Sequence, residues 1–217
     1  MRVFEYAMLA VVALMSIARA APLPEADLKN LLAAIRQNRS TQADFQEERV
    51  IRLMKKPVVS SGTVWFQPPN KFRREVKGHS PSITVSDGRE LWIYYPNFKS
   101  AERYPLGKGS PLDATVAAIN SALNLENIET SFNISATKND NGHELALLPH
   151  TAAMKRVFQK LDLQINSESR VARTDMLLPN GERIVTTYLN QTRAPIPASM
   201  FEFKPPPGTE VSTPLGQ

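Results

Sequence analysis

Three histidines and a pair of adjacent glutamates are the residues whose types could support catalysis or bind a metal. His79, His143 and His150 are isolated, and none has the spacing to a second ligand that a zinc site requires. Glu47 and Glu48 lie in a segment that alternates like a strand, so their carboxylates must point to opposite faces of it. They therefore cannot act together as an acid and a base.

Other motifs of catalysis and ligand binding are also missing from the sequence. It contains no G-x-S-x-G elbow, and Gly-Lys-Gly-Ser at 107–110 lacks the spacing and the preceding strand of a phosphate-binding loop. Cysteine is absent, which excludes disulfides and thiol chemistry. The net charge is +5, but the basic residues are scattered, so no nucleic-acid partner is expected. We expect a binding protein and not an enzyme, with no catalytic residue, no metal and no cofactor.

Most of the chain alternates apolar and polar residues with a period of two, which is typical of half-buried β-strands. Turn residues separate the alternating segments, and Asp87-Gly88 is a strong hairpin signal because glycine readily adopts a positive φ. The predicted strands are 43–53, 63–67, 72–77, 82–85, 91–95, 99–104, 130–136, 144–148, 155–165, 170–178, 183–190 and 201–204. Consecutive strands with short connections predict one antiparallel meander and not a βαβ fold.

Each predicted strand has an apolar side and a polar side. Val64 and Phe66, for example, lie opposite Thr63 and Gln67. A sheet with one apolar side must cover that side. We therefore expect a mainly β (α+β) fold: a single curved antiparallel sheet that forms an incomplete β-barrel, with helices as a lid over an apolar cavity. An outer-membrane barrel is the other all-β possibility, but the charges on both strand faces near Glu47 disfavour it.

Two segments are predicted as helices. The first follows Pro24 and carries leucines and an isoleucine at helical spacing up to Ile35. The second begins with Ser110 as its N-cap and Pro111 at its first position. One face of this second helix is apolar and is the expected lid surface: Leu112, Val116, Ile119 and Leu123.

The N-terminus predicts export. Arg2 precedes an apolar run at 7–18, and Ala-Arg-Ala at 18–20 is a typical signal peptidase site. The run is shorter than the ~20 residues of a membrane-spanning helix. We expect residues 1–20 to be a cleaved signal peptide and residues 21–217 to form one domain. No cysteine follows the cleavage site, so we expect a soluble protein without an N-terminal lipid anchor, outside the cytoplasm.

Five segments of the chain resemble the LolA family of periplasmic lipoprotein carriers. They are Ala-Asp-Phe-Gln at 43–46, Gly-Thr-Val-Trp-Phe at 62–66, Pro-Asn-Lys-Phe at 69–72, the stretch 85–94, and the closing stretch 201–211. The resemblance covers nearly the whole mature chain. It implies an incomplete barrel whose helical lid covers an apolar cavity for the acyl chains of lipoproteins. It also implies a monomer in the periplasm that takes its cargo from an inner-membrane release complex and delivers it to an outer-membrane acceptor.

The resemblance and the alternation together assign candidate site residues. Phe72 matches the family position that docks the inner-membrane release complex, and we expect its side chain to be exposed. The expected lipid-binding residues are Phe45, Val64, Phe66, Ile83, Val85, Leu91, Ile93, Leu112, Val116, Ile119 and Leu123.

One position departs from the family pattern. The family commonly has an arginine before the proline that matches Pro69, and this arginine holds the lid of the empty carrier shut. Here the position is Pro68, which has no side-chain donor. Arg74 should point inward and is a candidate replacement for the latch, or it extends to the rim of the cavity. The missing arginine favours one alternative, a LolA-like carrier of another lipid or lipid-linked product. A periplasmic lipoprotein-sensing half-barrel domain is a second alternative, which has the same fold.

Overall fold

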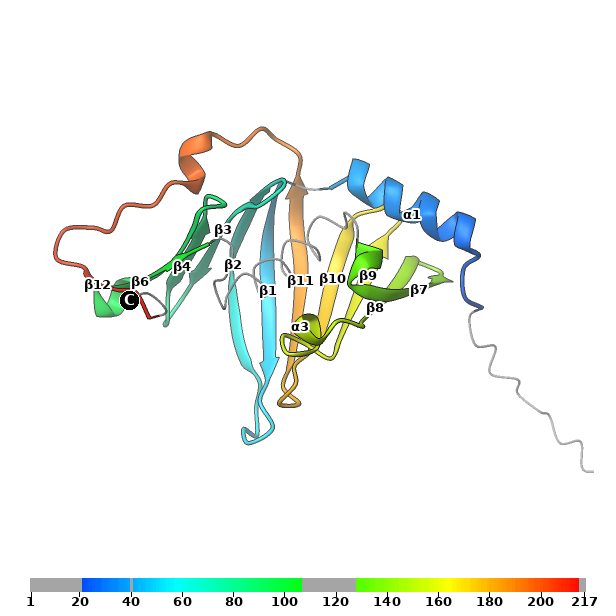
Figure 1. Ribbon diagram of the computed structural model, residues 1–217, viewed down its shortest axis with the longest axis horizontal. Helices are drawn as coiled ribbons and strands as arrows, with labels where there is room; N and C mark the ends of the chain where they lie inside the picture. The colour runs from blue at the N-terminus through cyan, green and yellow to red at the C-terminus, as the bar shows by residue number, and fades with distance from the viewer. Residues whose placement is uncertain (1–20, 40, 107–127, 215–217) are drawn as a thin grey trace, which may run out of the picture.

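The computed structural model describes residues 21–39, 41–106 and 128–214, and these residues form one long, curved, open sheet (Figure 1). The sheet has twelve strands in the order β12-β6-β5-β4-β3-β2-β1-β11-β10-β9-β8-β7. In the described part of the chain its two end strands, β12 and β7, do not pair, so the barrel is incomplete. The predicted fold class is confirmed.

The elements have the following bounds. The first six strands are β1 (Gln42–Val50), β2 (Val58–Gln67), β3 (Lys71–Lys77), β4 (Ser82–Ser86), β5 (Glu90–Tyr95) and β6 (Ser100–Pro105). The other six are β7 (Phe132–Asn139), β8 (Gly142–Pro149), β9 (Lys160–Asn166), β10 (Val171–Leu177), β11 (Arg183–Thr192) and β12 (Glu210–Ser212). The helices are α1 (Glu25–Gln37), α3 (Ala152–Lys155) and the 3-10 turns η1 (Pro96–Phe98), η2 (Ile128–Thr130) and η3 (Ala198–Phe201).

The sheet consists of two meanders and not the single one that we predicted. Strands β1 to β6 follow one another in space, and so do β7 to β11. The meanders join where β1 pairs antiparallel with β11, at what we call the seam. Asp44 ties three strands together there, since it accepts hydrogen bonds from Thr63 of β2 at 3.0 Å and from Asn190 of β11 at 2.8 Å. These bonds lower the pKa of Asp44, the one to Asn190 contributing most.

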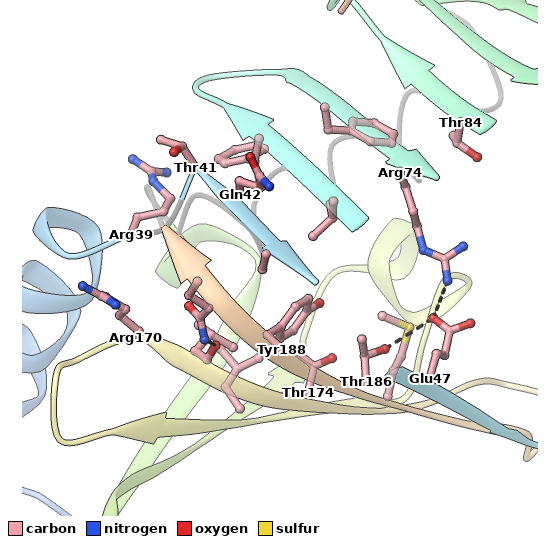
Figure 2. Close-up of a pocket in the computed structure, with 18 of the residues that line it drawn as sticks. Arg39, Thr41, Gln42, Glu47, Arg74, Thr84, Arg170, Thr174, Thr186 and Tyr188 are labelled. Carbon is pink, nitrogen blue, oxygen red and sulfur yellow. Dashed lines mark hydrogen bonds and ion pairs between the residues drawn. The ribbon is translucent and has the colours of Figure 1, made fainter. Parts of the chain in front are cut away.

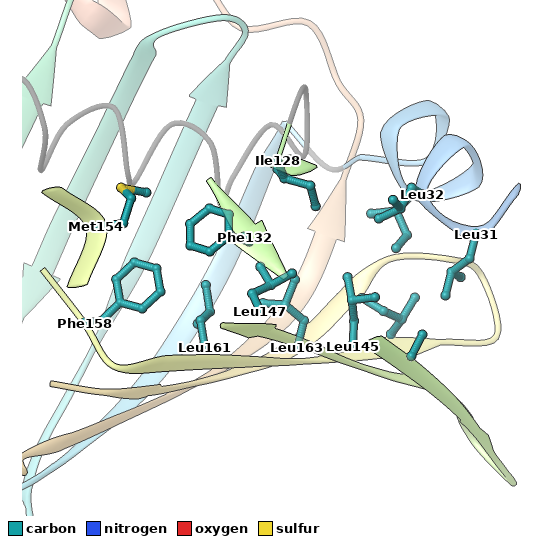
Figure 3. Packing of buried hydrophobic residues seen from close by; sticks show 13 residues of the cluster. Leu31, Leu32, Ile128, Phe132, Leu145, Leu147, Met154, Phe158, Leu161 and Leu163 are labelled. Carbon is teal, nitrogen blue, oxygen red and sulfur yellow. The ribbon is translucent and has the colours of Figure 1, made fainter. Parts of the chain in front are cut away.

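The largest hydrophobic core lies under α1, against the second meander (Figure 3). Leu31, Leu32 and Ile35 form the buried face of α1, as their helical spacing predicts. They pack onto apolar residues of β7, β8 and β9, and Phe132 stacks on Phe158 with ring centroids 5.6 Å apart. This core fixes α1 over one end of the sheet. The helix therefore does not cover the centre of the same face.

The segment after β11 crosses the opposite face of the first meander, and we call this the outer face (Figure 1). Phe203 lies against Trp92 and Tyr94, each with ring centroids 5.6 Å apart, and Arg73 donates a hydrogen bond to the carbonyl of Met200 at 3.2 Å. The prediction of a strand at 201–204 is therefore wrong, because the aromatic contacts of this segment replace strand pairing. The last strand is β12, which pairs parallel with β6.

The second predicted helix, with its lid residues, lies outside the described residues. In the part of the chain that the structure describes, no helix is both long and apolar enough to cross a membrane.

Candidate functional site

A cavity of about 570 Å³ lies on the face of the sheet opposite to the outer face, which we call the inner face (Figure 2). Both meanders and the C-terminal end of α1 contribute to its walls. Because the seam runs between the two walls, the β1–β11 pairing forms the floor. A cavity of this volume with mostly apolar walls is typical of small-molecule binding sites.

Four of the predicted lipid-binding residues line this cavity: Val64, Phe66, Leu91 and Ile93. Val64 and Phe66 come from β2, and Leu91 and Ile93 come from β5. In both strands the alternation identified the correct side.

Ile83 and Val85 do not face the cavity, and that expectation is wrong. Cross-strand partners share a face, and Ile83 pairs with Tyr94 while Val85 pairs with Trp92 on the outer face. The polar residue between them, Thr84, lines the cavity instead. Val85 is buried all the same, on the face that the C-terminal segment crosses.

The expectation that Phe72 is exposed is also wrong. Phe72 pairs with Phe66 across β2 and β3, so its ring points inward. It packs with Phe66 and Leu91 in a small core cluster, is 7% exposed and lines the cavity. A side chain so deeply buried cannot form the surface of a docking interface in this conformation.

Phe45 lies on the inner face but under a second layer of side chains. It faces Gly62 of β2, and its ring covers the space above that glycine. The Arg74 guanidinium lies over the same ring, with its carbon 4.3 Å from the ring centroid. Phe45 therefore contacts both Gly62 and Arg74, and Arg74, not Phe45, lines the cavity.

Arg74 points inward, as its strand parity predicts, and is held by an ion pair inside the cavity. It donates a hydrogen bond to Glu47 of β1 at 2.9 Å, and Thr186 of β11 donates to the same carboxylate oxygen at 3.3 Å (Figure 2). Glu48 points away and is exposed, so the two glutamates are separated as expected. The predicted lid residues lie outside the described part of the chain. The role of Arg74 as a latch for this lid therefore stays a prediction.

Removing one partner of this pair should destabilise the protein more than removing both. Glu47→Leu leaves the Arg74 charge without its carboxylate in a partly buried place, and we expect it to lower the free energy of unfolding by about 1–3 kcal/mol. Arg74→Met should have a similar cost. The double variant should lie closer to wild type because no unpaired charge remains. Urea unfolding of the four proteins measures the coupling, and strictly additive losses would contradict it.

Strands β9, β10 and β11 supply the second wall of the cavity. None of their residues was among the predicted binding residues, although they show the same alternation. The lining residues of these strands are Leu161, Leu163, Val171, Thr174, Met176, Ile184, Thr186, Tyr188 and Gln191. The signal was present as i, i+2 spacing of Leu161 and Leu163 in β9, whereas Thr174 and Thr186 make the inner sides of β10 and β11 look less apolar.

Two tyrosines of the walls stay uncharged at neutral pH. Burial raises the pKa of Tyr188. Burial, aided by the carboxylate of Glu102, raises the pKa of Tyr104 to about 12, and the Tyr104 hydroxyl donates to Glu102 at 2.6 Å.

Three arginines line the end of the cavity near α1: Arg36, Arg39 and Arg170. Figure 2 shows Arg39 and Arg170 at this end of the cavity. Arg39 lies over the ring of Phe66, 5.4 Å from its centroid, and Arg170 forms an ion pair with Glu168 at 3.0 Å. The Nε atoms of Arg36 and Arg170 are buried and form no hydrogen bond within the described part of the chain. This end of the cavity is therefore basic, while its centre is apolar around the Arg74–Glu47 pair.

The four lid residues Leu112, Val116, Ile119 and Leu123 lie outside the described residues, so their place relative to the cavity stays a prediction. Among the residues that the structure does describe, no cluster of histidine, aspartate and glutamate could hold a metal ion.

The family follows from comparison with known proteins. The family described as "Outer membrane lipoprotein carrier protein LolA" matches residues 36–204, which span every strand of the cavity wall. The chain belongs to the LolA family. Pro68, where the resemblance leads one to expect an arginine, lies in the exposed turn between β2 and β3 of this LolA-family chain.

Relatives named outer-membrane lipoprotein carrier protein share modest identity with it. The one from Methylibium petroleiphilum is 29% identical over 157 residues, which are 70% of this chain and 72% of the relative. The one from Dechloromonas aromatica is 26% identical over 179 residues, 82% and 83% of the two chains. An uncharacterised conserved protein from Thermus thermophilus has the same fold, with a TM-score of 0.53 at 15% identity over 86% of this chain and 99% of that one. A LolA superfamily protein from Nitrosomonas europaea has a TM-score of 0.45 at 13% identity, over 81% and 97%.

Proposed function

We propose that this protein is a periplasmic carrier that shields the acyl chains of lipoproteins and moves them from the inner to the outer membrane. The observation that carries the proposal is the apolar cavity on the inner face of a LolA-family sheet. Acyl chains are the cargo because its central lining is aliphatic and aromatic, with Val64, Leu91 and Ile93 on one wall and Leu161 and Leu163 on the other. No catalytic step is part of this function.

The energetics of such cargo require delivery by hand-off. Burying an acyl chain gains ~0.8 kcal/mol per methylene, so a chain of about 16 carbons gains roughly 12 kcal/mol before binding costs. Spontaneous release into water would then be very slow. The carrier therefore needs a donor, which we propose is an inner-membrane release complex, and an acceptor at the outer membrane. We propose that it works as a monomer.

The arginines at the α1 end favour a second candidate, a carrier of an anionic lipid. The acylated cysteine of a lipoprotein carries no phosphate that would need Arg36, Arg39 or Arg170. A phosphate or carboxylate head group would accept hydrogen bonds from these guanidinium groups while its chains lay in the apolar part of the cavity.

Mass spectrometry of cargo distinguishes the two candidates. The mature chain is exported to the periplasm of a Gram-negative host, purified without detergent, and analysed for bound lipoproteins and lipids. Intact acylated lipoprotein is the expected result for the first candidate. The second candidate predicts a bound anionic lipid that is lost in the double variant Arg36→Gln/Arg170→Gln. The control variant Arg173→Gln, on the other face of β10, should keep this lipid. A protein that carries neither and extracts neither from inner-membrane vesicles would contradict both.

A further inference from the structure

The tip of the β1–β2 hairpin, residues 49–59, exposes an unusual amount of apolar surface. Leu53 is 97% exposed, and Met54 and Val59 are 52% and 67% exposed. Val50 and Val58 are each 44% exposed. Single exposed apolar residues are normal on a protein surface, but five large ones within ten positions form a patch, and such patches mark interaction sites.

The same tip is basic. It contains Arg49, Arg52, Lys55 and Lys56, and no aspartate or glutamate. Arg49 is neutralised by Glu182 in the neighbouring β10–β11 turn, 2.5 Å away. The other three cations keep the tip positive, so its partner should be both apolar and negatively charged.

The hairpin also projects from the body of the sheet. Figure 1 shows the β1–β2 tip projecting beyond the ends of the neighbouring strands, beside the β10–β11 turn. The Arg52 side chain lies against Gly181 of that turn, which supports the tip from one side. Met54 donates a backbone hydrogen bond to Ile51 at 2.9 Å and so closes a turn that presents Leu53 at the end of the projection.

We propose that the β1–β2 tip is a membrane-docking element that inserts Leu53 and Met54 into the interface of a bilayer containing anionic lipids. Apolar side chains flanked by lysine and arginine are the composition that binds such interfaces, since burial of apolar groups and attraction to anionic head groups act together. Lys55 and Lys56 are adjacent to the inserted pair and would lie at the level of the head groups.

Docking through this element would bring the cavity close to the bilayer. Both strands of the hairpin contribute cavity walls, and Glu47 is three residues before Val50, a distance of roughly 10 Å along a strand. The inference goes beyond the proposed function, because a carrier served only by protein donors and acceptors needs no bilayer contact of its own.

Vesicle sedimentation with the purified mature chain tests the proposal. Wild type should bind vesicles of phosphatidylcholine with phosphatidylglycerol and should bind pure phosphatidylcholine far more weakly. The double variant Lys55→Gln/Lys56→Gln should reduce binding to the anionic vesicles by about 25-fold, because each positive charge that is removed should weaken binding by about fivefold. Leu53→Asp/Met54→Asp should abolish it. Phe98→Asp is the matched control, since Phe98 is 81% exposed in η1, away from the hairpin, and this change should leave binding unaltered.

A single label locates the contact. Because the chain has no cysteine, Leu53→Cys and Phe98→Cys each provide one thiol for an environment-sensitive fluorophore. The emission of the label at position 53 should shift to the blue on anionic vesicles, and that of the label at 98 should not. Absence of vesicle binding by wild type would overturn the proposal, as would full binding by Leu53→Asp/Met54→Asp. So would a tip that mediates dimers and binds no vesicles, because its partner would then be a second copy. None of these readouts depends on cargo, so the proposal and the carrier function can fail separately.

Discussion

Ile93→Glu should abolish binding of an acyl chain while the protein stays folded. Ile93 is half-buried and lines the central apolar part of the cavity, so a carboxylate there would lose its hydration when a chain enters. An unpaired buried charge costs several kcal/mol, and we expect affinity for a fluorescent 16-carbon fatty acid to fall at least about 100-fold. Fluorescence titration measures the affinity, and circular dichroism confirms the fold.

Ile83→Glu is the matched control for this prediction. It makes the same chemical change at a half-buried position of the adjacent strand, but on the outer face, where Ile83 pairs with Tyr94. Its affinity for the fatty acid should stay within about twofold of wild type. A strong loss of fatty-acid affinity in Ile83→Glu, together with normal binding by Ile93→Glu, would contradict the prediction and place the binding site on the outer face of the sheet.

Gly62→Ala should cause a large loss of stability although it adds a single methyl group. A Cβ at position 62 would lie 1.8 Å from the carbonyl oxygen of Glu75 and 2.9 Å from Cε1 of Phe45. The first contact is with backbone, so it cannot be relieved by rotating a side chain. We expect the free energy of unfolding to fall by more than about 3 kcal/mol, at the upper end of overpacking effects.

Urea unfolding of Gly62→Ala and Ser61→Ala measures this effect. Ser61 is the exposed neighbour of Gly62 in β2, and its change to alanine should stay within about 0.5 kcal/mol of wild type. Gly62→Ala should also disturb the contact of Phe45 with Arg74, since the ring must move away from the new methyl. A Gly62→Ala protein as stable as wild type would show that β2 and β3 can separate there without cost.

The strands were predictable because alternation is a local property, and it gave the inward side of β2 and β5 but not that of β4. Ile83 and Val85 alternate with the polar Thr84, whereas Leu91 and Ile93 alternate with the aromatic Trp92 and Tyr94. Alternation shows that two faces exist, and the hairpin register decides which residues share one. Across the turn that Asp87 closes by accepting bonds from the amides of Arg89 and Glu90, Ser86 pairs with Leu91 and Val85 with Trp92. Val85 and Leu91 therefore lie on opposite faces of the sheet.

The two-sided burial of the first meander explains the remaining errors. If only the inner face of the sheet were covered, the apolar side chains of Ile83 and Val85 would be expected to point to that face. Here the segment after β11 covers the outer face as well, through Phe201 and Phe203. Nothing local in 201–204 distinguishes a strand from an extended segment held by aromatic contacts. The Arg74–Glu47 pair also joins residues from separate strands, and only the register brings them together.

The seam has a consequence for the order in which the chain folds. Thr41, just before β1, bonds to the carbonyl of Thr192, 151 positions later in the chain. If the chain enters the periplasm from its N-terminus, as the proposed function requires, the edge of β1 that faces β11 stays unpaired until β11 has been translocated. Such an edge is a template for pairing with other chains, and closing so long a loop is intrinsically slow. The first meander alone is therefore an aggregation-prone intermediate, and a periplasmic chaperone that holds it until translocation ends should raise the yield of folded protein.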